Sequence, residues 1–518
     1  MSEIEWTILD DSNIVESYPG ITLPLTYSFI RIAYRGVFKG IIGSCLRNEN
    51  ILAKFEDIFD NMIKSYNGHI YYCINNWYSL IDFIPFSKKI IPIWQDMMGV
   101  RDHNVYLGKR HNFTLWQKIK MYTNLLKNCL RIPRDMKLLN GDFLTVKKYF
   151  DDNYRETLSV TELLTLFHEI ERRLLDKWHT TLANDLYAFI WTGLLKLRLK
   201  KKGVDVTGYI SGITSLESIK PVQALLDIAQ KYGDDTNLLS NRTVCEYIQM
   251  YGDRSPCELK LEVMTYREDP SMLVQKIQEY AKDKTKLKDM IKNLQNRGPA
   301  PLKNTFALKR ARLGIQNREI SRLNRSRIYG MVRRIFISIG KHLHQDGYIN
   351  EPFDVFYLEI GEIIENDTNS FRKKIADRKA EYTEYEKLLP RSRLVFRGDK
   401  LVDEKTPSKW TGGFTGTGVS PGIITAEAVV LESPDEKSYV NGKIIVTQTT
   451  DPGWVFLLTM AGGIIAEKGS LLSHTAIVSR ELKIPAVVAV ENAVSVIKTG
   501  DIVKIDGDTG RVEIVRTS

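Results

Sequence analysis

One histidine near the C-terminus has the surroundings that phosphoryl chemistry requires. It is His474, in the segment GGIIAEKGSLLSHTAIVSRELKIPAVVAV, where a Gly/Ser-rich turn leads into a predicted helix over Thr475–Leu482. Ile464–Ile465 and Ala486–Val490 are predicted to be short buried strands on either side of the turn and helix. A helix N-terminus attracts anions and disfavours the imidazolium cation, because its N–H groups are unpaired and the helix dipole is positive there. A neutral imidazole at such a position can accept a phosphoryl group.

The residues around His474 can complete an anion site. The hydroxyls of Ser473 and Thr475 can hold phosphoryl oxygens, together with backbone N–H groups of the turn through Gly469 and Ser470. On position alone, a lone histidine in such a loop-to-helix turn is usually a helix cap or a surface residue. A relay histidine also needs an open path to donor and acceptor, so we expect the ring not to be enclosed in an apolar interior.

A longer stretch around this histidine resembles a known family. The segment TDPGWVFLLTMAGGIIAEKGSLLSHTAIVSRELKIPAVV is similar to the swivelling phosphohistidine domain of the phosphoenolpyruvate (PEP)-utilising enzymes. The similarity covers roughly Phe414 to Val515 and includes GTGVSPGIITAEAVV and GDIVKIDGDTGRVEIV. Ser470 stands where the family usually has a second glycine. The resemblance implies that His474 is the residue that becomes phosphorylated.

Earlier segments resemble the helical substrate domain of rifampicin phosphotransferases and PEP-synthase-like proteins. They are GITLPLTYSF, NGHIYYCINNWY, KWHTTLANDLYAFIWTGLL and YGDRSPCELKLEVMTYREDP. The resemblance implies acceptor-site residues at Asn184, Asp185, Asp253, Arg254 and Glu258. Asp253 stands where many relatives have a histidine, so the substrate of a relative cannot be transferred to this chain.

Two readings of these acceptor-domain residues stay open. Arg254 can hold a phosphoryl oxygen through its planar guanidinium, with Glu258 or Asp185 orienting the acceptor or taking its proton. Alternatively, Arg254 and Glu258 lie four apart and can form an ion pair on one helix face, and Asn184 and Asp185 can cap a helix.

The pattern of helices and strands predicts an α+β multidomain protein. A mainly α-helical substrate (acceptor)-binding domain is expected over residues 1–390, followed by a polar, glycine-dotted linker or hinge over residues 391–413. Residues 414–518 are expected to form the swivelling β/β/α phosphohistidine domain. The hinge is needed because one histidine must serve two distant sites.

The resemblance also implies a partner. Members of the family recharge their histidine with an ATP-grasp nucleotide domain or a PEP-using barrel, and neither pattern is found in these 518 residues. We therefore expect a dikinase-type phosphotransferase subunit that receives a phosphoryl group from ATP and Mg²⁺ through a separate ATP-grasp protein. A small molecule would be the acceptor, and no tightly bound cofactor or metal is expected. The alternatives are a PEP-synthase-like activity with a partner, and a non-enzymatic phospho-carrier or regulator.

Net charge and the length of apolar runs bear on whether the protein binds nucleic acid or a membrane. The net charge is +10, and the longest basic stretch is a predicted helix over Leu313–Leu343. It lacks a recognition motif and interleaved aromatics, so a solvated helix face or a docking surface is expected and nucleic acid is not an expected partner. No apolar run reaches about 18 residues, and the first residues do not resemble a signal peptide. We expect a cytoplasmic protein with no membrane partner.

Overall fold

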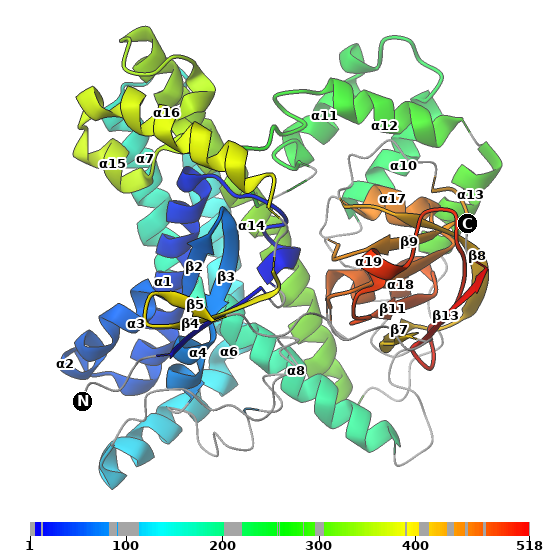
Figure 1. Cartoon of the computed structure of the whole chain (residues 1–518), viewed down its shortest axis with the longest axis horizontal. Coiled ribbons are helices and arrows are strands. Elements are labelled where there is room, and N and C mark those ends of the chain that lie inside the picture. Colours follow the sequence, from blue (N-terminus) through cyan, green and yellow to red (C-terminus); the bar gives the residue numbers. More distant parts are fainter. Residues whose placement is uncertain are drawn as a thin grey trace. The chain divides into compact units, whose positions relative to one another are not determined.

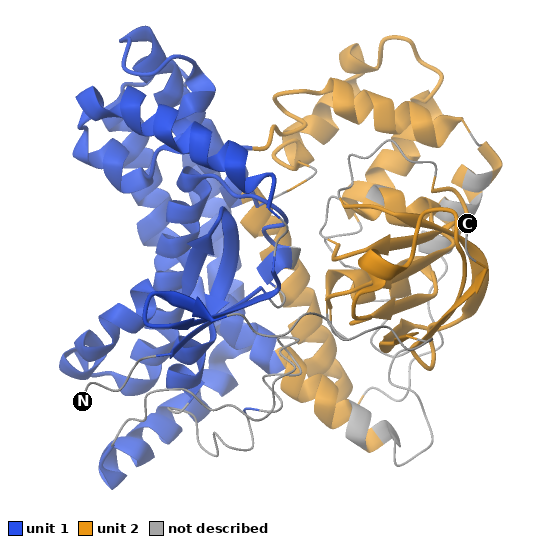
Figure 2. Cartoon of the chain, viewed as in Figure 1, with its two compact units in different colours: residues 1–187, 259–262, 328–406 blue, residues 188–258, 263–327, 407–518 orange. Residues whose placement is uncertain are grey.

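The chain divides into two units. The computed structural model describes residues 6–11, 14–81, 91, 113–200, 220–255, 257, 259–282, 284–295, 305–388, 391–402, 414–432, 440–450, 454–469 and 473–516. Unit 1 holds residues 1–187, 259–262 and 328–406, and unit 2 holds residues 188–258, 263–327 and 407–518 (Figure 2). The acceptor domain expected over residues 1–390 is therefore shared between both units. Two long helices, α8 (His179–Lys200) and α14 (Phe306–Gln345), each run from one unit into the other, which their sequence alone does not reveal.

Unit 1 combines helices with one sheet (Figure 1). Its other α-helices are α1 (Pro24–Leu46), α2 (Glu49–Leu52), α3 (Glu56–Asp60), α4 (Ile74–Ile81), α6 (Leu115–Asn153), α7 (Val160–Arg173), α15 (Ile360–Glu365) and α16 (Thr368–Tyr385). Its 3-10 helices are η1 (Ile14–Glu16), η2 (Ala53–Phe55), η3 (Leu175–Lys177) and η5 (Pro352–Tyr357). Helix α1 packs against α6, α3, η3, η5 and α15, and its buried side chains belong to a single large core.

The sheet of unit 1 corrects the expected linker. Its strands are β1 (Trp6–Asp10), β2 (Ile63–Tyr66), β3 (His69–Cys73), β4 (Arg393–Arg397) and β5 (Lys400–Val402), in the antiparallel order β2-β3-β1-β4-β5. Residues 393–402 were assigned to the linker of residues 391–413, but they form a hairpin that pairs with β1. Leu394 and Val395 are both buried and belong to different apolar clusters, since successive side chains of a strand point to opposite faces of the sheet. The polar residues around this short strand made the segment look like a linker. Residues 403–413 lie outside the described part of the chain.

The GITLPLTYSF motif begins the central helix of unit 1. Pro24 is at the first position of α1, where its missing N–H costs nothing. The Glu262 carboxylate accepts hydrogen bonds from Leu23 N (3.1 Å) and Thr26 Oγ1 (2.5 Å), and so satisfies donors at the start of α1. The short segment Leu259–Glu262 thereby belongs to unit 1 although the residues on both sides of it belong to unit 2.

Unit 2 contains an eight-stranded sheet and a set of helices (Figure 1). Its first helices are α10 (Lys220–Tyr232), η4 (Leu238–Ser240), α11 (Arg242–Tyr251), α12 (Ser271–Ala281) and α13 (Lys284–Gln295). The strands are β6 (Phe414–Thr415), β7 (Thr417–Ser420), β8 (Ile423–Val430), β9 (Ile444–Thr447), β10 (Gly463–Ala466), β11 (Ala486–Val488), β12 (Ile502–Asp506) and β13 (Arg511–Arg516). Three helices complete this part: α17 (Val455–Met460), α18 (His474–Leu482) and α19 (Ala493–Val496).

The middle of this sheet is parallel. The order is β6-β13-β12-β8-β9-β10-β11-β7, and β8, β9, β10 and β11 pair in parallel. Parallel neighbours need crossover connections, and α17 and α18 supply them between β9 and β10 and between β10 and β11. Loops that follow β9 and β10 therefore meet at the same edge of the sheet.

Helices α10 to α13 pack on the sheet through a shared apolar core. Side chains such as Leu226 and Ile277 belong to the same buried cluster as Leu458, Ala476 and Val478. Tyr280 Oη lies 3.1 Å from Thr459 Oγ1, both within this unit. This core connects residues that the sequence assigned to different domains.

The basic helix α14 is not a solvated face. No residue between 311 and 333 is exposed, and enclosed guanidinium nitrogens include those of Arg318, Arg322 and Arg325. The expectation of a solvated face over Leu313–Leu343 was wrong there, because neighbouring elements cover the helix on all sides.

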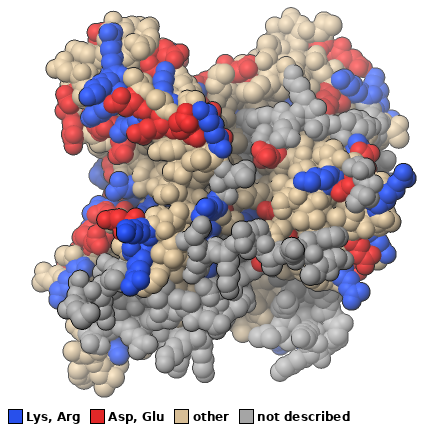
Figure 3. All heavy atoms as spheres, viewed as in Figure 1, with Lys and Arg blue, Asp and Glu red and all other residues tan. Residues whose placement is uncertain are grey.

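The surface that Figure 3 shows carries charges of both signs. Over α15 and α16, basic and acidic side chains alternate, and Glu362 forms ion pairs with Arg378 (2.7 Å) and Lys374 (3.3 Å). This part of the surface has no one-sign patch that would select an anionic polymer. In the described part of the chain, no helix is long and apolar enough to span a bilayer.

Two glycines in helices of unit 1 give a matched test of packing. A Cβ at Gly340 in α14 would lie 2.2 Å from the carbonyl oxygen of Pro352, whereas a Cβ at Gly141 in α6 meets nothing within 4 Å. We expect Gly340→Ala to lower the free energy of unfolding by about 1–3 kcal/mol through overpacking. Gly141→Ala should raise it by up to about 1 kcal/mol, because alanine favours the helix. Urea unfolding of both variants checks this, and equal effects of the two substitutions would contradict the packing of α14 on η5.

Candidate active site

His474 lies at the first position of α18, the helix that comes after β10 in the chain. The predicted strands and helix are confirmed: β10 contains Ile464–Ile465, β11 begins at Ala486, and α18 ends at Leu482. His474 thus lies at the N-terminus of α18, where the helix dipole is positive, as the sequence indicated.

The two ring nitrogens of His474 have different surroundings. Nδ1 lies 3.2 Å from Thr450 Oγ1, which also lies 2.8 Å from Thr475 Oγ1. Nε2 is buried and makes no hydrogen bond within the described part of the chain. Thr450 follows β9 and His474 follows β10, so the adjacent parallel strands bring them to the same sheet edge. Nδ1 therefore contacts a hydroxyl group, whereas Nε2 has no hydrogen-bond partner among the described residues.

The imidazole is buried among polar and charged groups. Its exposed fraction is 2%, which contradicts the expectation of an openly accessible ring. Burial holds the pKa of His474 well below its ordinary value, and the positive charges of Arg322 and Arg254 lower the pKa further. The ring is therefore neutral at physiological pH. The Thr450 hydroxyl lies beside the ring, and the charges of Arg322 and Arg254 act on it, so polar and charged groups contribute to its surroundings.

The turn before α18 has a constrained backbone. Gly469 has φ +131°, a region that side chains disfavour, and a Cβ there would lie 3.1 Å from Ser473 Oγ. Ser473 is the N-cap of α18, and its Oγ accepts a hydrogen bond from Ala476 N at 3.3 Å. The Ser473 hydroxyl therefore already caps the helix in this arrangement. Ser470, the fourth expected phosphoryl-binding residue, lies outside the described part of the chain.

Arg254 is the acceptor-domain residue that the structure brings to His474. It is 4% exposed, it follows α11, and its charge acts on the imidazole. Its neighbour Asp253 accepts a hydrogen bond from Arg267 Nε at 2.9 Å, so this carboxylate is committed to an ion pair that ties the loop together. Glu258, the expected partner of Arg254 or of the acceptor, lies outside the described residues.

Asn184 and Asp185 are not placed with His474. Both lie in the middle of α8, in the part of that helix that belongs to unit 1, whereas His474 belongs to unit 2. The alternative reading as helix caps is wrong, because α8 begins five residues earlier, at His179. Asn184 is fully buried and Asp185 is partly buried.

Sequence reasoning missed two residues of the site. Arg322 was assigned to a solvated helix, and Thr450 had no assigned role although it lies in the TDPGW segment. A signal for Thr450 existed, since loops after adjacent parallel strands share one edge of a sheet. No comparable signal marks Arg322, because a basic helix has the same sequence pattern whether it is exposed to solvent or covered by other elements. The described residues contain no group of three or more His, Cys, Asp or Glu side chains that could hold a metal ion.

Comparisons with known proteins agree with this geometry. Residues 439–510 match the family described as PEP-utilising enzyme, mobile domain. The chain is 30% identical to the rifampicin phosphotransferase of Bacillus subtilis over 336 residues, which is 57% of this chain and 38% of that protein. It is 45% identical to a probable phosphoenolpyruvate synthase of Staphylothermus marinus over 100 residues, 19% of this chain and 12% of that protein.

A further relative is similar along nearly the whole chain. An uncharacterised protein of Mycobacterium tuberculosis is 26% identical over 550 residues, covering 97% of this chain and 61% of that protein. The chain thus spans less than two thirds of the length of these relatives. The matched residues 439–510 include Thr450 and His474, the pair that the parallel strands bring together. Residues 439–510 of this chain are therefore similar to the mobile domain of the PEP-utilising enzymes.

Proposed function

We propose that this chain is a phosphotransferase that works through a phosphohistidine at His474. The observation that carries the proposal is the state of the ring: neutral, with Nε2 making no hydrogen bond in the described structure and two guanidinium charges acting on it. Phosphotransferases among the relatives support the same reaction class.

The hydrogen-bond geometry supports Nε2 as the nucleophile. A proton on Nδ1 can be donated to Thr450 Oγ1, which leaves the lone pair on Nε2. In the first step this lone pair attacks phosphorus, a new N–P bond forms, and the P–O bond to the leaving group of the donor breaks. In the second step an acceptor hydroxyl attacks phosphorus, the N–P bond breaks, and the hydroxyl proton passes to a base.

Arg322 and Arg254 would hold the transferred group. Phosphoryl transfer has a loose transition state whose charge is spread over the phosphoryl oxygens, so fixed cations stabilise it. The same charges that disfavour imidazolium favour a phosphorylated imidazole, because the sign of the charge on the ring is reversed. The burial of His474 means that donor and acceptor reach the ring only after the cover formed by the helical residues opens.

The proposal also includes the source of the phosphoryl group and the molecule that accepts it. We infer a dikinase-type reaction in which a separate ATP-grasp protein, using ATP and Mg²⁺, transfers a phosphoryl group to His474. A small-molecule acceptor would bind in the helical part of the chain, and the names of the relatives suggest rifampicin and pyruvate as the first compounds to examine. Asp185 and Glu258 remain proposed acceptor residues.

The first prediction concerns transfer from His474. We expect the chain treated with phosphoramidate, a small phosphoryl donor, to carry acid-labile phosphate on His474 and on the exposed His168. Addition of an accepted compound should remove phosphate from His474 and not from His168, because His474, unlike His168, is at a helix N-terminus and is acted on by two arginines. Mass spectrometry of peptides and of the small molecule measures both, with rifampicin and pyruvate added separately.

The His474→Ala variant is the control for this transfer. It should keep its label on His168 and phosphorylate no acceptor. Undiminished acceptor phosphorylation by this variant would overturn the mechanism. Label that leaves His474 only for another protein would favour the phospho-carrier instead.

The second prediction separates Arg322 from the rest of the basic helix. Arg322→Gln should slow transfer from His474 by about 10- to 100-fold, the value of a charge-assisted hydrogen bond to the phosphoryl group. Lys309→Gln changes the same charge at an exposed position of α14 and should leave the rate unchanged. Single-turnover transfer rates of the two labelled variants test this, and equal rates would remove Arg322 from the site.

The third prediction concerns pH. Because the pKa of His474 is lowered by folding, the folded protein binds fewer protons at this ring than the unfolded chain does. The free energy of unfolding should therefore fall as the pH drops below about 6.5, by at most about 1.4 kcal/mol per pH unit from this group. His474→Gln has no titrating ring and should show a smaller loss between pH 7 and pH 5 in urea unfolding. Identical pH dependence in both proteins would contradict a depressed pKa.

A further inference from the structure

The first half of α6 has an exposed apolar stripe that the proposed reaction does not use. Large apolar side chains recur there at helical spacing and face solvent: Leu115, Trp116, Ile119, Tyr122, Leu126 and Leu130. Three of them are at least 72% exposed, namely Leu115, Trp116 and Leu130. An unbroken row of this kind is unusual on a free surface and marks a binding face.

The stripe belongs to a helix that is already folded. Thr114 and Gln117 form a capping box at its start, and α6 packs against α1. The opposite side of the helix is buried through Met121, Ile132 and Met136. The exposed residues are therefore not the core-facing side of the helix, and they are presented on a preformed scaffold.

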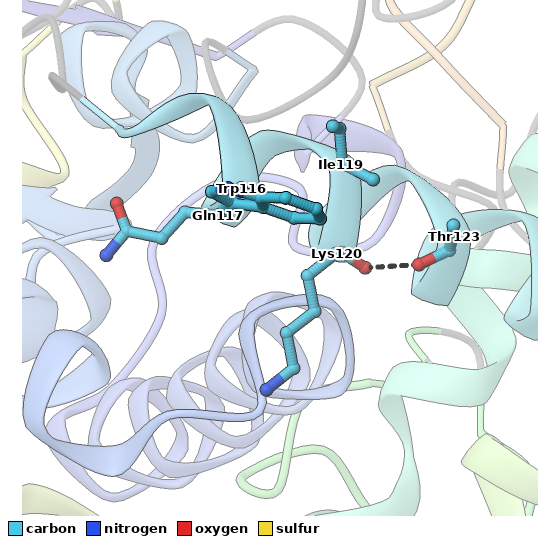
Figure 4. Close-up of a pocket in the computed structure, with 5 residues that line it drawn as sticks. All are labelled: Trp116, Gln117, Ile119, Lys120 and Thr123. Carbon is cyan, nitrogen blue, oxygen red and sulfur yellow. Dashed lines mark hydrogen bonds between the residues drawn. The ribbon is translucent and has the colours of Figure 1, made fainter.

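The charge of α6 changes along its length. Residues 115–134 hold five basic residues and no Asp or Glu, whereas residues 135–153 hold three Lys and four Asp. Lys118, Lys120 and Lys127 are exposed beside the apolar row. A surface pocket of about 440 Å³ on this part of the helix is lined by residues that include Trp116, Ile119 and Lys120, which Figure 4 labels. Basic charge and exposed apolar side chains thus coincide on the same half of α6.

Three kinds of occupant can be compared. A second copy of the same face would bring like charges together, which disfavours it. A protein partner is less suited, because lysine is depleted from protein interfaces. An anionic lipid surface fits best: lysine stems lie along apolar surface while their charges reach the head groups, and Trp and Tyr favour the same boundary. We propose that the first half of α6 binds peripherally to an anionic lipid bilayer.

This proposal differs from the sequence-based expectation of no membrane partner. That expectation rested on the lack of a long apolar run, which concerns spanning segments. A helix that lies in the interface needs only an apolar face and a basic rim. The proposal does not depend on the phosphoryl reaction.

Vesicle sedimentation of the full chain tests the proposal. We expect binding to phosphatidylcholine vesicles that contain phosphatidylglycerol, no binding to vesicles of phosphatidylcholine alone, and weaker binding as salt is added. The apolar pair Leu126→Ser/Leu130→Ser and the charge pair Lys120→Glu/Lys127→Glu should each weaken binding at least about tenfold.

Matched substitutions on the second half of α6 are the controls. Leu138→Ser/Leu144→Ser and Lys137→Glu/Lys148→Glu change exposed residues of the same helix and should leave vesicle binding unchanged. No binding to the anionic vesicles, or equal loss in test and control variants, would overturn the proposal. Binding to RNA that needs the lysines but not Leu126 and Leu130 would assign the face to nucleic acid instead. Thermal melting of every variant verifies that the fold is retained.

Discussion

The central physical constraint is a buried imidazole that must stay uncharged beside two guanidinium groups. An imidazolium at His474 would lose hydration and lie in the positive field of Arg322 and Arg254, and both effects favour the neutral ring. A neutral ring whose Nδ1 is held by Thr450 has its second nitrogen available for chemistry. The surrounding strands and helices keep the imidazole neutral and hold Nδ1 beside Thr450.

Two structural arrangements create this local state. The parallel strands β9 and β10 bring Thr450 and His474 to one edge of the sheet, and α18 directs its N-terminus at the same point. The apolar core shared by α10 to α13 and the sheet includes Tyr251 and Tyr266, which lie on either side of Arg254 in the chain, and the charge of Arg254 acts on the ring. Arg322, on α14, adds a second positive charge. The same arrangement restricts the access of other molecules to the imidazole, because His474 is only 2% exposed. Under the function proposed above, donor and acceptor reach His474 only when its cover opens, and a mobile domain would provide this opening.

The sequence predicted the local structure of the site well and its surroundings poorly. The helix N-terminus and the flanking strands around His474 follow from local periodicity and capping, and the structure contains them. Arg322 could not be found in this way, because its role depends on α14 being covered by elements far away in sequence. The hairpin at residues 393–402 was missed for a similar reason, since its pairing partner is β1 at the other end of the chain. Long-range pairing and burial decide these features, and local composition does not report them.

The most direct test of the central claim is the protonation state of His474 itself, observed by NMR with ¹⁵N-labelled histidine and assigned with the His474→Gln variant. The account predicts a neutral ring with its proton on Nδ1, and a ring that stays neutral below a pH of about 6.5, the ordinary pKa of a histidine. A ring that becomes protonated at that ordinary value, or that carries its proton on Nε2, would contradict the account.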